Sequence, residues 1–550
     1  MVLLSLCAGA FAMTDGTYTA EGAGLNGPVT VQVEIAGDAI ASITVTNHAE
    51  TQGVGTLAID ALPDLIVSGQ TLDVDTVAGA TITSNAILAA VEDALAQAGG
   101  SKDSLTPVNV EKEAVTLEDA KTQVVIAGAG GAGMVAALEA KEKGLDVILV
   151  EKVGLVGGTS ALSSTALNAG GSSVQMAMDK PFTADDYYKK VMGNAEEEDE
   201  GVRVMADLSG HVVDWLIDMG ADMSRVINGS QHTPADGSAY GAMLIPVLDK
   251  QLSAKGIDVR LNTKATEIIM QDGKAIGLKV ETADGSYSIF ADAVLLATGG
   301  FASSPEKVDE YTPQWSGYPS TASIGATGDG IDMAVAAGAT LGNMGTASPQ
   351  TVAYDTGHGA VSLTNVRYNG AIIVNEEGNR FANELGSTAV LGDAIKSQTG
   401  GHAFLVFDQV SVDNAVLMSE YKARGYFTEA DSLEALAEKL GINAENLAAT
   451  VERYRAAVDA GEDPDFGRKD SLFSKIDTAP FYGVLISPAN QTTNGGINID
   501  AYCRVLDADG APIAGLYAAG ETTNHKGHGM TVATVLGYLA ADTIAADLAK

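Results

Sequence analysis

A glycine-rich turn between a buried strand and a helix constrains the fold of this chain more than any other feature. Gln123 to Lys152 reads as a βαβ unit whose first turn is Gly128-Ala129-Gly130-Gly131-Ala132-Gly133. The first glycine allows the tight turn, the second lets a pyrophosphate approach the backbone, and the third permits close helix–strand packing. Glu151 ends the second strand, where a carboxylate can bind ribose hydroxyls. These elements in this order predict a dinucleotide-binding fold, and a tight turn without a ligand is the alternative.

Composition narrows the class of protein. The 550 residues are too many for one core, so two to four domains are expected. The 71 acidic and 32 basic residues give a net charge of −39, which argues against nucleic acid and anionic membranes as partners. The two cysteines, Cys7 and Cys503, cannot build a disulfide framework or a thiolate cluster, and no CxxCH attaches a haem. The histidine spacing matches no metal motif, so we expect no metal site.

The pattern along the chain predicts an α/β protein with three folded parts. Residues 13–100 form a small α+β domain, with a hairpin turning at Gly37-Asp38 and a helix from Asn85, and a polar linker covers 101–121. A Rossmann-like domain spans 122–350 and resumes at 493–550. Residues 351–492, with amphipathic helices, form an inserted α+β capping domain.

The first twelve residues, MVLLSLCAGAFA, have the pattern of an export signal. Ala10-Phe11-Ala12 fits a cleavage site, although the basic n-region is missing and the match of Leu4 to Cys7 to a lipobox is faint. A buried N-terminal strand is the alternative. The pattern favours export, so we expect a soluble or peripherally attached protein outside the cytoplasmic membrane.

Several further segments resemble the fumarate reductase/succinate dehydrogenase flavoprotein family from about Val124 to the C-terminus. They are Glu151-Lys152, Gly157-Gly158-Thr159-Ser160, Asn168-Ala169-Gly170-Gly171, Ala297-Thr298-Gly299-Gly300-Phe301, Thr327-Gly328-Asp329-Gly330 and Ala519-Gly520-Glu521. The resemblance implies a non-covalent FAD-binding domain. It places Glu151 on the adenosine ribose, the glycines at the pyrophosphate, and Asp329 and Glu521 along the ribityl chain.

The small domain carries a second flavin signal. Asp75-Thr76-Val77-Ala78-Gly79-Ala80-Thr81 resembles the motif on which a flavin transferase esterifies FMN to threonine, with Ala78 departing at the hydroxyl position. His48-Ala49-Glu50-Thr51 and the hairpin also resemble the FMN-binding domain of extracellular flavin reductases. The resemblance implies covalent FMN on Thr81, with Thr83 as the fallback. Alternatively, this stretch is a turn before a helix, with Thr83 or Ser84 as N-cap.

The resemblance weakens at the substrate site. In the family, hydride passes from the flavin to one alkene carbon, an arginine protonates the other, and His, Arg and Thr side chains bind carboxylates. The segment Gly378 to Glu384 matches, but Thr388 replaces the proton-donating arginine, and Thr364-Asn365-Val366-Arg367 keeps only the arginine of its motif. Pro349-Gln350-Thr351, Thr492-Thr493-Asn494-Gly495-Gly496 and Thr531-Val532 lack the other charged contacts. Neutral side chains cannot replace guanidinium, so we expect an enoate with one carboxylate or an uncharged enone rather than fumarate.

The proton donor remains open among several residues. The candidates are Tyr354, His358, Arg367, Tyr368, His525, Lys526 and His528, of which Arg367, Tyr354, His525, Lys526 and His528 are taken forward as catalytic. Histidine suits acid–base chemistry, but a solvated loop explains the 525–528 cluster equally well. Ordinary packing is the simpler interpretation of each tyrosine. Arg367 is either a relay or an ion pair with Glu384 or Glu376, and Arg380 is structural.

The leading hypothesis is an exported reductase of an activated C=C bond. Electrons would come from a membrane or extracellular donor, pass through FMN and FAD, and reach a small unsaturated substrate. A dehydrogenase related to ketosteroid dehydrogenases, which introduces the double bond, is one alternative, and a flavin electron carrier with a degenerate substrate site is another. An apolar-walled pocket with a few aimed donors would favour an enzyme over the carrier.

Overall fold

The computed structural model describes residues 13–25, 27–50, 55–74, 80–108, 117–164, 166–195, 197–357, 359–415, 417–472, 474–527 and 529–550. The expected export signal, most of the FMN attachment motif, His358 and His528 lie outside the described residues. The chain divides into two compact units, one formed by residues 1–116 with 153–155 and the other by the rest.

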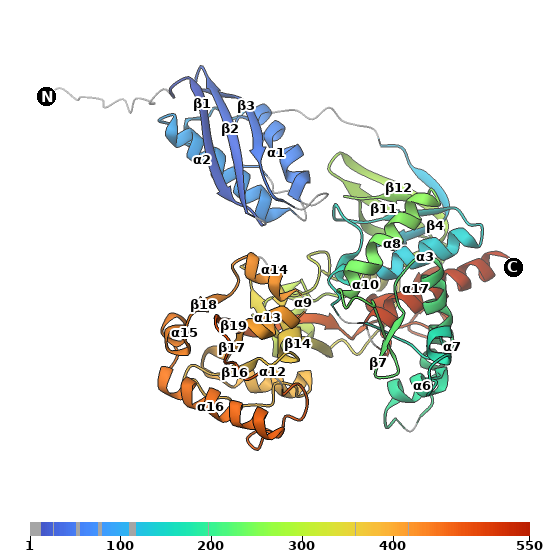
Figure 1. Ribbon diagram of the computed structural model, residues 1–550. Coiled ribbons are helices and arrows are strands. Elements are labelled where there is room, and N and C mark those ends of the chain that lie inside the picture. The colour runs from blue at the N-terminus through green and yellow to red at the C-terminus, as the bar shows by residue number, and fades with distance from the viewer. Residues whose placement is uncertain are drawn as a thin grey trace. The chain divides into compact units, whose positions relative to one another are not determined.

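The first unit is a three-stranded antiparallel sheet with two helices on one face (Figure 1). Its strands are β1 (Gly16–Ala23), β2 (Pro28–Ala36) and β3 (Ala39–Asn47), and its helices are α1 (Gly55–Gly69) and α2 (Thr81–Gln97). Every second side chain of β2 is buried against the helices, as the alternating pattern predicts. The predicted hairpin is confirmed, because Gly37 and Asp38 have φ of 60° and 63° and join paired strands.

Helix α2 begins four residues before the start predicted at Asn85. Ala80 is its N-cap and supplies no side-chain hydrogen bond. Thr83 and Ser84 therefore lie in the first turn, and the interpretation of either residue as N-cap was wrong. Thr83 is buried, and its hydroxyl donates a hydrogen bond to the Glu50 carboxylate.

The larger unit contains an eight-stranded sheet in the order β10-β11-β22-β12-β4-β5-β9, with β21 paired to β22. These strands are β4 (Ala120–Ala127), β5 (Val147–Val150), β9 (Asp258–Arg260), β10 (Lys264–Gln271), β11 (Lys274–Thr282), β12 (Gly285–Leu296), β21 (Arg504–Leu506) and β22 (Pro512–Ala518). The strands β22, β12, β4, β5 and β9 run parallel to their neighbours in this order. Such a parallel sheet is buried on both faces, which explains the continuous apolar runs in the second half of β4 and in β5.

Helices cover one face of this sheet. They are α3 (Gly131–Glu142), α7 (Glu200–Asp218), α8 (Tyr240–Ala254) and α17 (Gly529–Leu548), with α6 (Ala184–Met192) beside α7. Among the described helices, α17 has the length and apolar character of a membrane span, but most of its residues are packed in this core. Gly133 lets α3 approach β4, because a Cβ there would come within 1.9 Å of the Gly128 carbonyl oxygen. The predicted packing role of this glycine is therefore confirmed.

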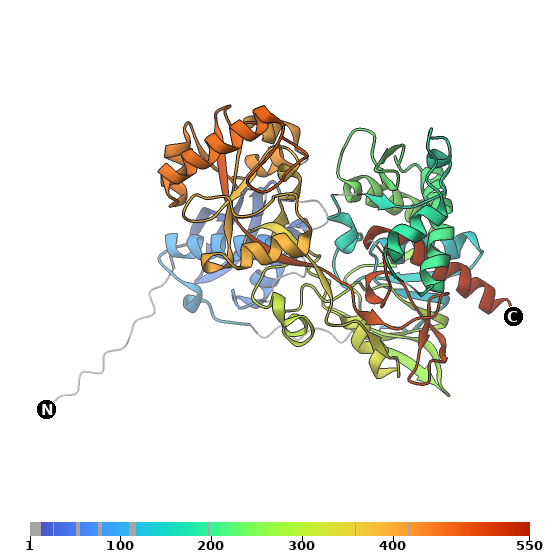
Figure 2. The same cartoon turned by 90° about the horizontal axis from the view of Figure 1, so that it is seen from below.

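A six-stranded sheet forms the other part of the larger unit, built from β14 (Ala347–Asp355), β15 (Ala360–Ser362), β16 (Ile372–Val374), β17 (Ala403–Asp408), β18 (Thr428–Ala430) and β19 (Phe481–Thr493). Helices α12 (Thr388–Lys396), α13 (Gln409–Asn414) and α14 (Met418–Ala423) pack on one face. On the other face lie α15 (Leu433–Leu440) and α16 (Ala444–Ala460), seen along the outer edge in Figure 2. This arrangement of sheet and helices is the α+β texture that the sequence predicted.

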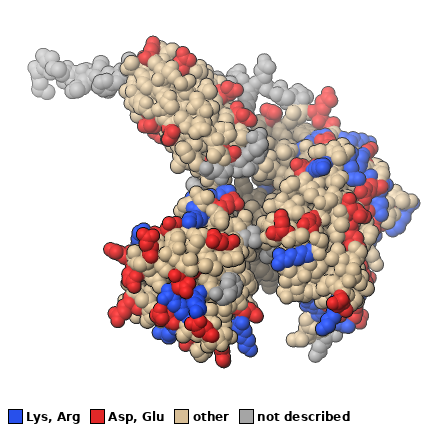
Figure 3. Space-filling model, viewed as in Figure 1, with Lys and Arg blue, Asp and Glu red and all other residues tan. Residues whose placement is uncertain are grey.

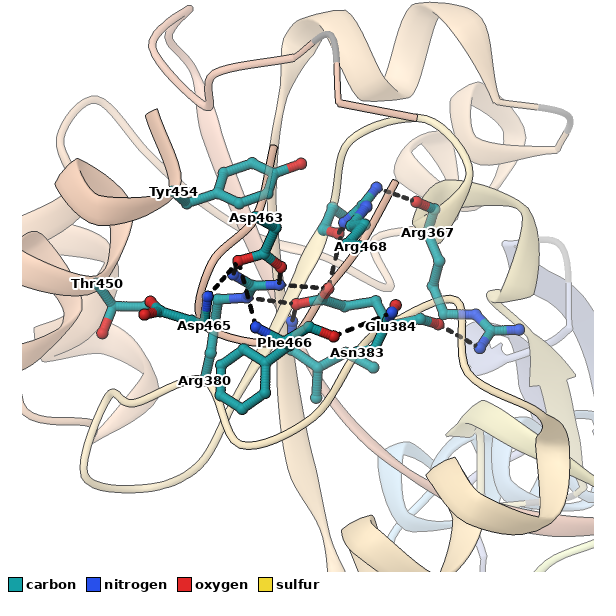
Figure 4. Close-up of polar contacts among 12 residues, drawn as sticks. Arg367, Arg380, Asn383, Glu384, Thr450, Tyr454, Asp463, Asp465, Phe466 and Arg468 are labelled. Atoms are coloured by element: carbon teal, nitrogen blue, oxygen red, sulfur yellow. Dashed lines mark hydrogen bonds and ion pairs between the residues drawn. The ribbon is translucent and has the colours of Figure 1, made fainter. Parts of the chain in front are cut away.

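A buried ionic cluster joins the turn after β16 to the segment after α16 (Figure 4). Arg380 donates two hydrogen bonds of 2.8 Å to the Glu384 carboxylate and one of 2.9 Å to Asp463. Arg468, which is fully buried, lies 3.4 Å from the same Glu384 carboxylate. The prediction that Arg380 is structural is thus confirmed. Arg468 also donates hydrogen bonds to the carbonyls of Arg367 and Ala371, at 2.7 and 2.9 Å.

Removing the shared carboxylate should destabilise this part of the protein strongly. Glu384→Gln leaves two buried guanidinium groups short of counter-charge, which costs about 3–5 kcal/mol. The matched control is Asp207→Asn, which breaks the exposed ion pair with Arg203 and should cost less than about 1 kcal/mol. Denaturant unfolding followed by circular dichroism compares the two variants. If both variants lose the same free energy of unfolding, the ionic cluster has no special role in stability.

Candidate active site

A cavity of about 410 Å³ opens where β4, β5, β12 and β22 end. The carboxyl edge of a parallel sheet is where open α/β folds bind ligands. Its lining residues are Ala127, Gly128, Gly130, Gly131, Ala132, Val150, Glu151, Lys152, Gly158, Thr159, Ser160, Leu162, Ser163, Ser164, Ala166, Asn168, Thr263, Lys264, Ala265, Ala297, Thr298, Gly299, Thr321, Ser323, Gly325, Ala326, Gly529, Met530, Ala533, Asp329, Gln350, Thr364, Arg367, Tyr368, Thr388, Gln491, Thr492, Ala519 and Glu521.

The glycine turn forms a bare cradle at the N-terminus of α3. Gly130 lines the cavity, and the nearest atom to an added Cβ would be the Gly157 carbonyl oxygen, 3.9 Å away. The backbone N–H of Gly131 donates to the Ser160 hydroxyl at 3.2 Å, which fixes the neighbouring turn. An uncapped helix N-terminus beside an open backbone suits a pyrophosphate, so these residues fit a dinucleotide.

Charged side chains stand at the end of the cavity near β5. The buried Glu151 carboxylate accepts a 2.8 Å hydrogen bond from the Ala129 N–H, which holds it at the edge of the cradle. Lys152 contacts Thr327 and forms an ion pair with Asp329, and Lys264 lies 3.3 Å from the other oxygen of Asp329. Burial alone would raise the pKa of Asp329, but Lys152, Thr327 and Lys264 hold it below the ordinary value. Asp329 is therefore ionised at neutral pH.

Glu521 lines the cavity after β22 and is held by one neighbour. Its carboxylate accepts a 2.9 Å hydrogen bond from the Thr493 N–H and a 3.3 Å bond from the Thr493 hydroxyl. Burial raises the pKa of Glu521 to about 7, and the bonds from Thr493 oppose that rise only partly. Gly300 makes room for this pair, because a Cβ there would lie 1.9 Å from the Thr493 hydroxyl.

The structure brings many of the predicted flavin residues to this cavity. Those that line it are Gly128, Gly130, Glu151, Lys152, Gly158, Thr159, Ser160, Thr298, Gly299, Asp329 and Glu521. Gly133, Gly157, Ala169, Gly170, Gly171, Gly300 and Gly520 lie outside the lining set. The absent side chain of Gly170 instead makes room for the backbone of Thr183, and that of Gly520 for Ala132. These glycines act through packing in the structure.

The wall of the cavity opposite the cradle comes from the six-stranded sheet and its helices. It is almost uncharged, and we call it the neutral wall. It consists of Gln350, Thr364, Arg367, Tyr368, Thr388, Gln491 and Thr492, and Arg367 is the one charged residue among these described lining residues. The Thr364 hydroxyl donates to the Gln350 side-chain oxygen, which orients that amide. The outer surface differs, since Asp and Glu are scattered over the face in Figure 3 with smaller groups of Lys and Arg. The net charge therefore says little about the cavity.

Arg367 is fixed by backbone carbonyls rather than by an ion pair. Its Nη1 donates to the Glu384 carbonyl at 2.7 Å and its Nε to the Thr364 carbonyl at 3.4 Å. Among the described residues none accepts a hydrogen bond from Nη2, and Figure 4 shows the guanidinium turned away from the ionic cluster. Burial lowers the pKa of Arg367, but a guanidinium remains cationic at neutral pH. The predicted ion pair with the Glu384 or Glu376 carboxylate is therefore not formed.

Other proton-donor candidates lie away from the cavity. The Tyr354 ring packs against Tyr426 with centroids 5.1 Å apart. Lys526 forms a 3.0 Å ion pair with Asp199, and the His525 ring lies beside Gly201 at the start of α7. Neither His525 nor Lys526 lines the cavity. The alternative of a solvated loop fits the exposed Lys526, whereas the His525 ring is partly buried against α7.

Two residues of the neutral wall were not assigned a role from the sequence, and a third was a proton-donor candidate that was not taken forward. Gln350 and Gln491 match no charged motif, and Tyr368 was interpreted as ordinary packing. In the sequence, Gln350 and Gln491 lie beside the departures at Thr351 and Thr492, and Tyr368 follows the retained Arg367. Among the described residues, no group of three or more His, Cys, Asp or Glu side chains could hold a metal ion.

Comparison with known proteins agrees with this geometry. Residues 123–533 match the FAD binding domain family and residues 24–96 the FMN-binding domain family. Urocanate reductase of Eggerthella lenta is 36% identical over 550 residues, which cover 95% of this chain and 90% of that protein. The cytochrome-type fumarate reductase of Shewanella frigidimarina is 36% identical over 410 residues, covering 73% of this chain and 72% of that protein.

A solved structure shows the same fold. The open conformation of a flavocytochrome c3 fumarate reductase matches with a TM-score of 0.68 and 33% sequence identity, over 78% of each chain. The resemblance found in the sequence is thereby confirmed. The chain belongs to the FAD-binding flavoprotein family that contains the fumarate and urocanate reductases, and it also carries an FMN-binding domain.

Proposed function

We propose that this protein reduces the activated C=C bond of a substrate with no more than one carboxylate. The observation that carries the proposal is the composition of the cavity. One side is the glycine cradle that fits a dinucleotide, and the other side is the neutral wall, whose one charged residue among the described lining residues is Arg367. Relatives named urocanate, acrylate and fumarate reductases support the reaction type. The cavity is open rather than filled or collapsed, which argues against a carrier with a degenerate site, although the wall opposite the cradle is polar rather than apolar.

The residues of the cradle would hold FAD, which supplies hydride when it is bound and reduced. The turn from Gly128 to Gly133 would receive the pyrophosphate, and Glu151 the adenosine ribose. Asp329 and Glu521 would lie along the rest of the cofactor. We propose residues 351–492 as the capping domain that closes over it.

The neutral wall would select the substrate by its charge. Arg367 offers Nη2 to one carboxylate, while the hydroxyls of Thr388 and Thr492 and the amides of Gln350 and Gln491 offer neutral hydrogen bonds. A second carboxylate would find no cation among these described residues. Leaving it buried and unpaired costs at least about 1–3 kcal/mol, which is roughly a tenfold to hundredfold loss.

Electrons would enter through FMN attached to Thr81 by a flavin transferase. The donor would be a membrane or extracellular protein, in keeping with the export pattern of residues 1–12. Two features support Thr81 over Thr83. Thr83 is only 2% exposed and its hydroxyl is bonded to Glu50, so it is shielded from a transferase.

A substrate panel on the anaerobically reduced protein tests the reaction. We expect acrylates with one carboxylate, or enones, to reoxidise the flavins at least about tenfold more efficiently than fumarate, because fumarate carries an unpaired second charge. Arg367→Met should raise KM for an enoate about tenfold or more, whereas Arg367→Lys should retain part of the affinity. Stopped-flow absorbance measures the rates. If no alkene reoxidises the flavins, the function is wrong, and equal efficiency with fumarate would refute the charge argument alone.

Attachment of FMN can be read on a denaturing gel. Thr81→Val should abolish the flavin fluorescence of the protein band, because it removes the hydroxyl that forms the phosphoester. Thr83→Val should keep the fluorescence but lower the melting temperature of the first unit, since it leaves the buried Glu50 carboxylate without its hydroxyl donor. The reverse pattern would move the attachment site to Thr83.

The stability of the flavin-free protein should depend on Glu521 in a definite direction. Because burial raises its folded pKa to about 7, protonated Glu521 favours the folded state, and this contribution is lost as pH rises from about 4.5 through 7. The difference in the free energy of unfolding between Glu521→Gln and wild type should therefore shift in favour of the variant as pH rises through that range, by on the order of 1–3 kcal/mol. Above that range this difference should be constant. Unfolding free energies at pH 5, 6, 7 and 8 (roughly spanning that window) provide the comparison. A constant difference would mean that Glu521 titrates normally.

A further inference from the structure

The neutral wall contains one side chain that can donate a proton to carbon without a metal or histidine. Of the described residues that line it, only Arg367 and Tyr368 carry a proton on a group more acidic than an alcohol or an amide. Threonine hydroxyls and glutamine amides do not ionise in water near neutral pH. The reduction of an alkene needs a proton as well as a hydride. Glu521 also lines the cavity, but it lies on the cradle side and its carboxylate accepts hydrogen bonds from Thr493. Within the neutral wall, the choice lies between the two adjacent residues Arg367 and Tyr368.

Arg367 is the weaker acid and is already engaged. An unperturbed phenol loses its proton near pH 10, whereas a guanidinium keeps its proton up to about pH 12. Two backbone carbonyls, those of Glu384 and Thr364, already accept hydrogen bonds from Arg367. Arg367 lines the cavity as a fixed positive charge, which suits binding better than proton transfer.

Tyr368 is placed at the end of the short helix α11 (Thr364–Arg367), and its backbone is held on both sides. Arg468 binds the carbonyl of Arg367 before it, at 2.7 Å. The Tyr454 hydroxyl donates to the Gly370 carbonyl after it, at 3.2 Å. The residue therefore sits on a rigid turn, as a group that must meet a reacting atom requires.

The environment of the Tyr368 ring also suits a proton donor. The Arg367 guanidinium lies 5.6 Å from the ring centre, within the range of a cation–π contact, so the two side chains are held next to each other. The side chain is half exposed, at 50%, and also lines the cavity. It can thus meet both a substrate inside and water outside, which can return the lost proton.

We propose that Tyr368 is the proton donor of the reaction, a proposal that rests on the proposed function. FAD, when bound and reduced, would supply the hydride with its two electrons to one alkene carbon, and this two-electron oxidation of the flavin would balance the reduction of the C=C bond. The Tyr368 hydroxyl gives its proton to the other carbon, so the C=C bond becomes a single bond with two new C–H bonds. The phenolate left behind takes a proton from water. The tyrosine replaces in function the arginine whose position Thr388 occupies.

The test is Tyr368→Phe in the holoenzyme, which keeps the ring and removes the hydroxyl. We expect the rate of flavin reoxidation at saturating alkene to fall about 100-fold or more, as loss of a general acid does. We expect the dissociation constant of the alkene for the oxidised enzyme, measured from the flavin absorbance change, to alter less than about threefold, because a binding role would affect affinity instead. The wild-type rate should also be lower in D₂O than in H₂O, because the proton from the tyrosine exchanges with solvent. The same solvent isotope effect should be smaller for the variant, because its residual reaction does not use the tyrosine proton.

Tyr502→Phe is the matched control. Tyr502 is 44% exposed, an arginine guanidinium (Arg504) lies 5.8 Å from its ring, and it does not line the cavity, so its variant should react at the wild-type rate. A Tyr368→Phe enzyme that keeps its flavins and turns over at the wild-type rate overturns the proposal while leaving the reductase function intact. Failure of wild type to reduce any alkene overturns both. If the variant loses affinity for the alkene by the same factor as it loses rate, Tyr368 acts in binding, and the proposal that it is the proton donor is also overturned.

Discussion

One buried carboxylate organises the part of the molecule that faces the cofactor cradle. Glu384 is fully buried and binds two arginines, Arg380 and Arg468. Its own backbone carbonyl binds Arg367, and Arg468 reaches back to the carbonyl of that same residue. Replacing such a cluster with apolar residues would often cost nothing in stability. Its presence here is better explained by what it positions, because it fixes the segment that brings Arg367 and Tyr368 to the cavity wall.

The two walls of the cavity obey different physical constraints. The cradle is set by backbone geometry, since Gly128 and Gly133 leave no space for side chains. Few substitutions are tolerated there, and the cofactor that it fits is correspondingly definite. The opposite wall is a set of side chains on a stable sheet, and threonine or glutamine can stand where a charged residue would without disturbing that sheet. Family members can therefore share a cofactor and a reaction type while differing in substrate.

The sequence predicted the parts that local patterns determine. The βαβ unit, the hairpin at Gly37-Asp38 and the structural role of Arg380 all follow from periodicity, turn chemistry or a motif, and all appear in the structure. The start of α2 was missed, because the early residues of that helix are small or β-branched and do not favour a helix by themselves. The helical hydrogen bond from the Ser84 N–H to the Ala80 carbonyl appears only in the structure.

The site was harder to predict because it depends on contacts between distant segments. His525 and Lys526 follow a cofactor motif closely in sequence, yet Lys526 pairs with Asp199 more than 300 residues earlier. Tyr354 and Tyr368 looked equivalent as isolated tyrosines, but one packs against Tyr426 and the other lines the cavity. No periodicity separates these two cases. Only the register of β14 and the turn after α11 decide which ring meets the substrate.

The small number of charged side chains on the neutral wall affects how well it can stabilise a developing negative charge. In water, a neutral wall would stabilise developing negative charge less well than guanidinium groups do. Inside a closed site, however, fixed hydroxyl and amide dipoles need no reorganisation as charge appears, so they act more strongly than in solvent. A wall of Gln350, Thr364, Thr388, Gln491 and Thr492 around one arginine can therefore still stabilise a single enolate charge. Under the proposed function, it would not stabilise that charge beside a second carboxylate, and this difference in electrostatics would separate the substrate from a dicarboxylate.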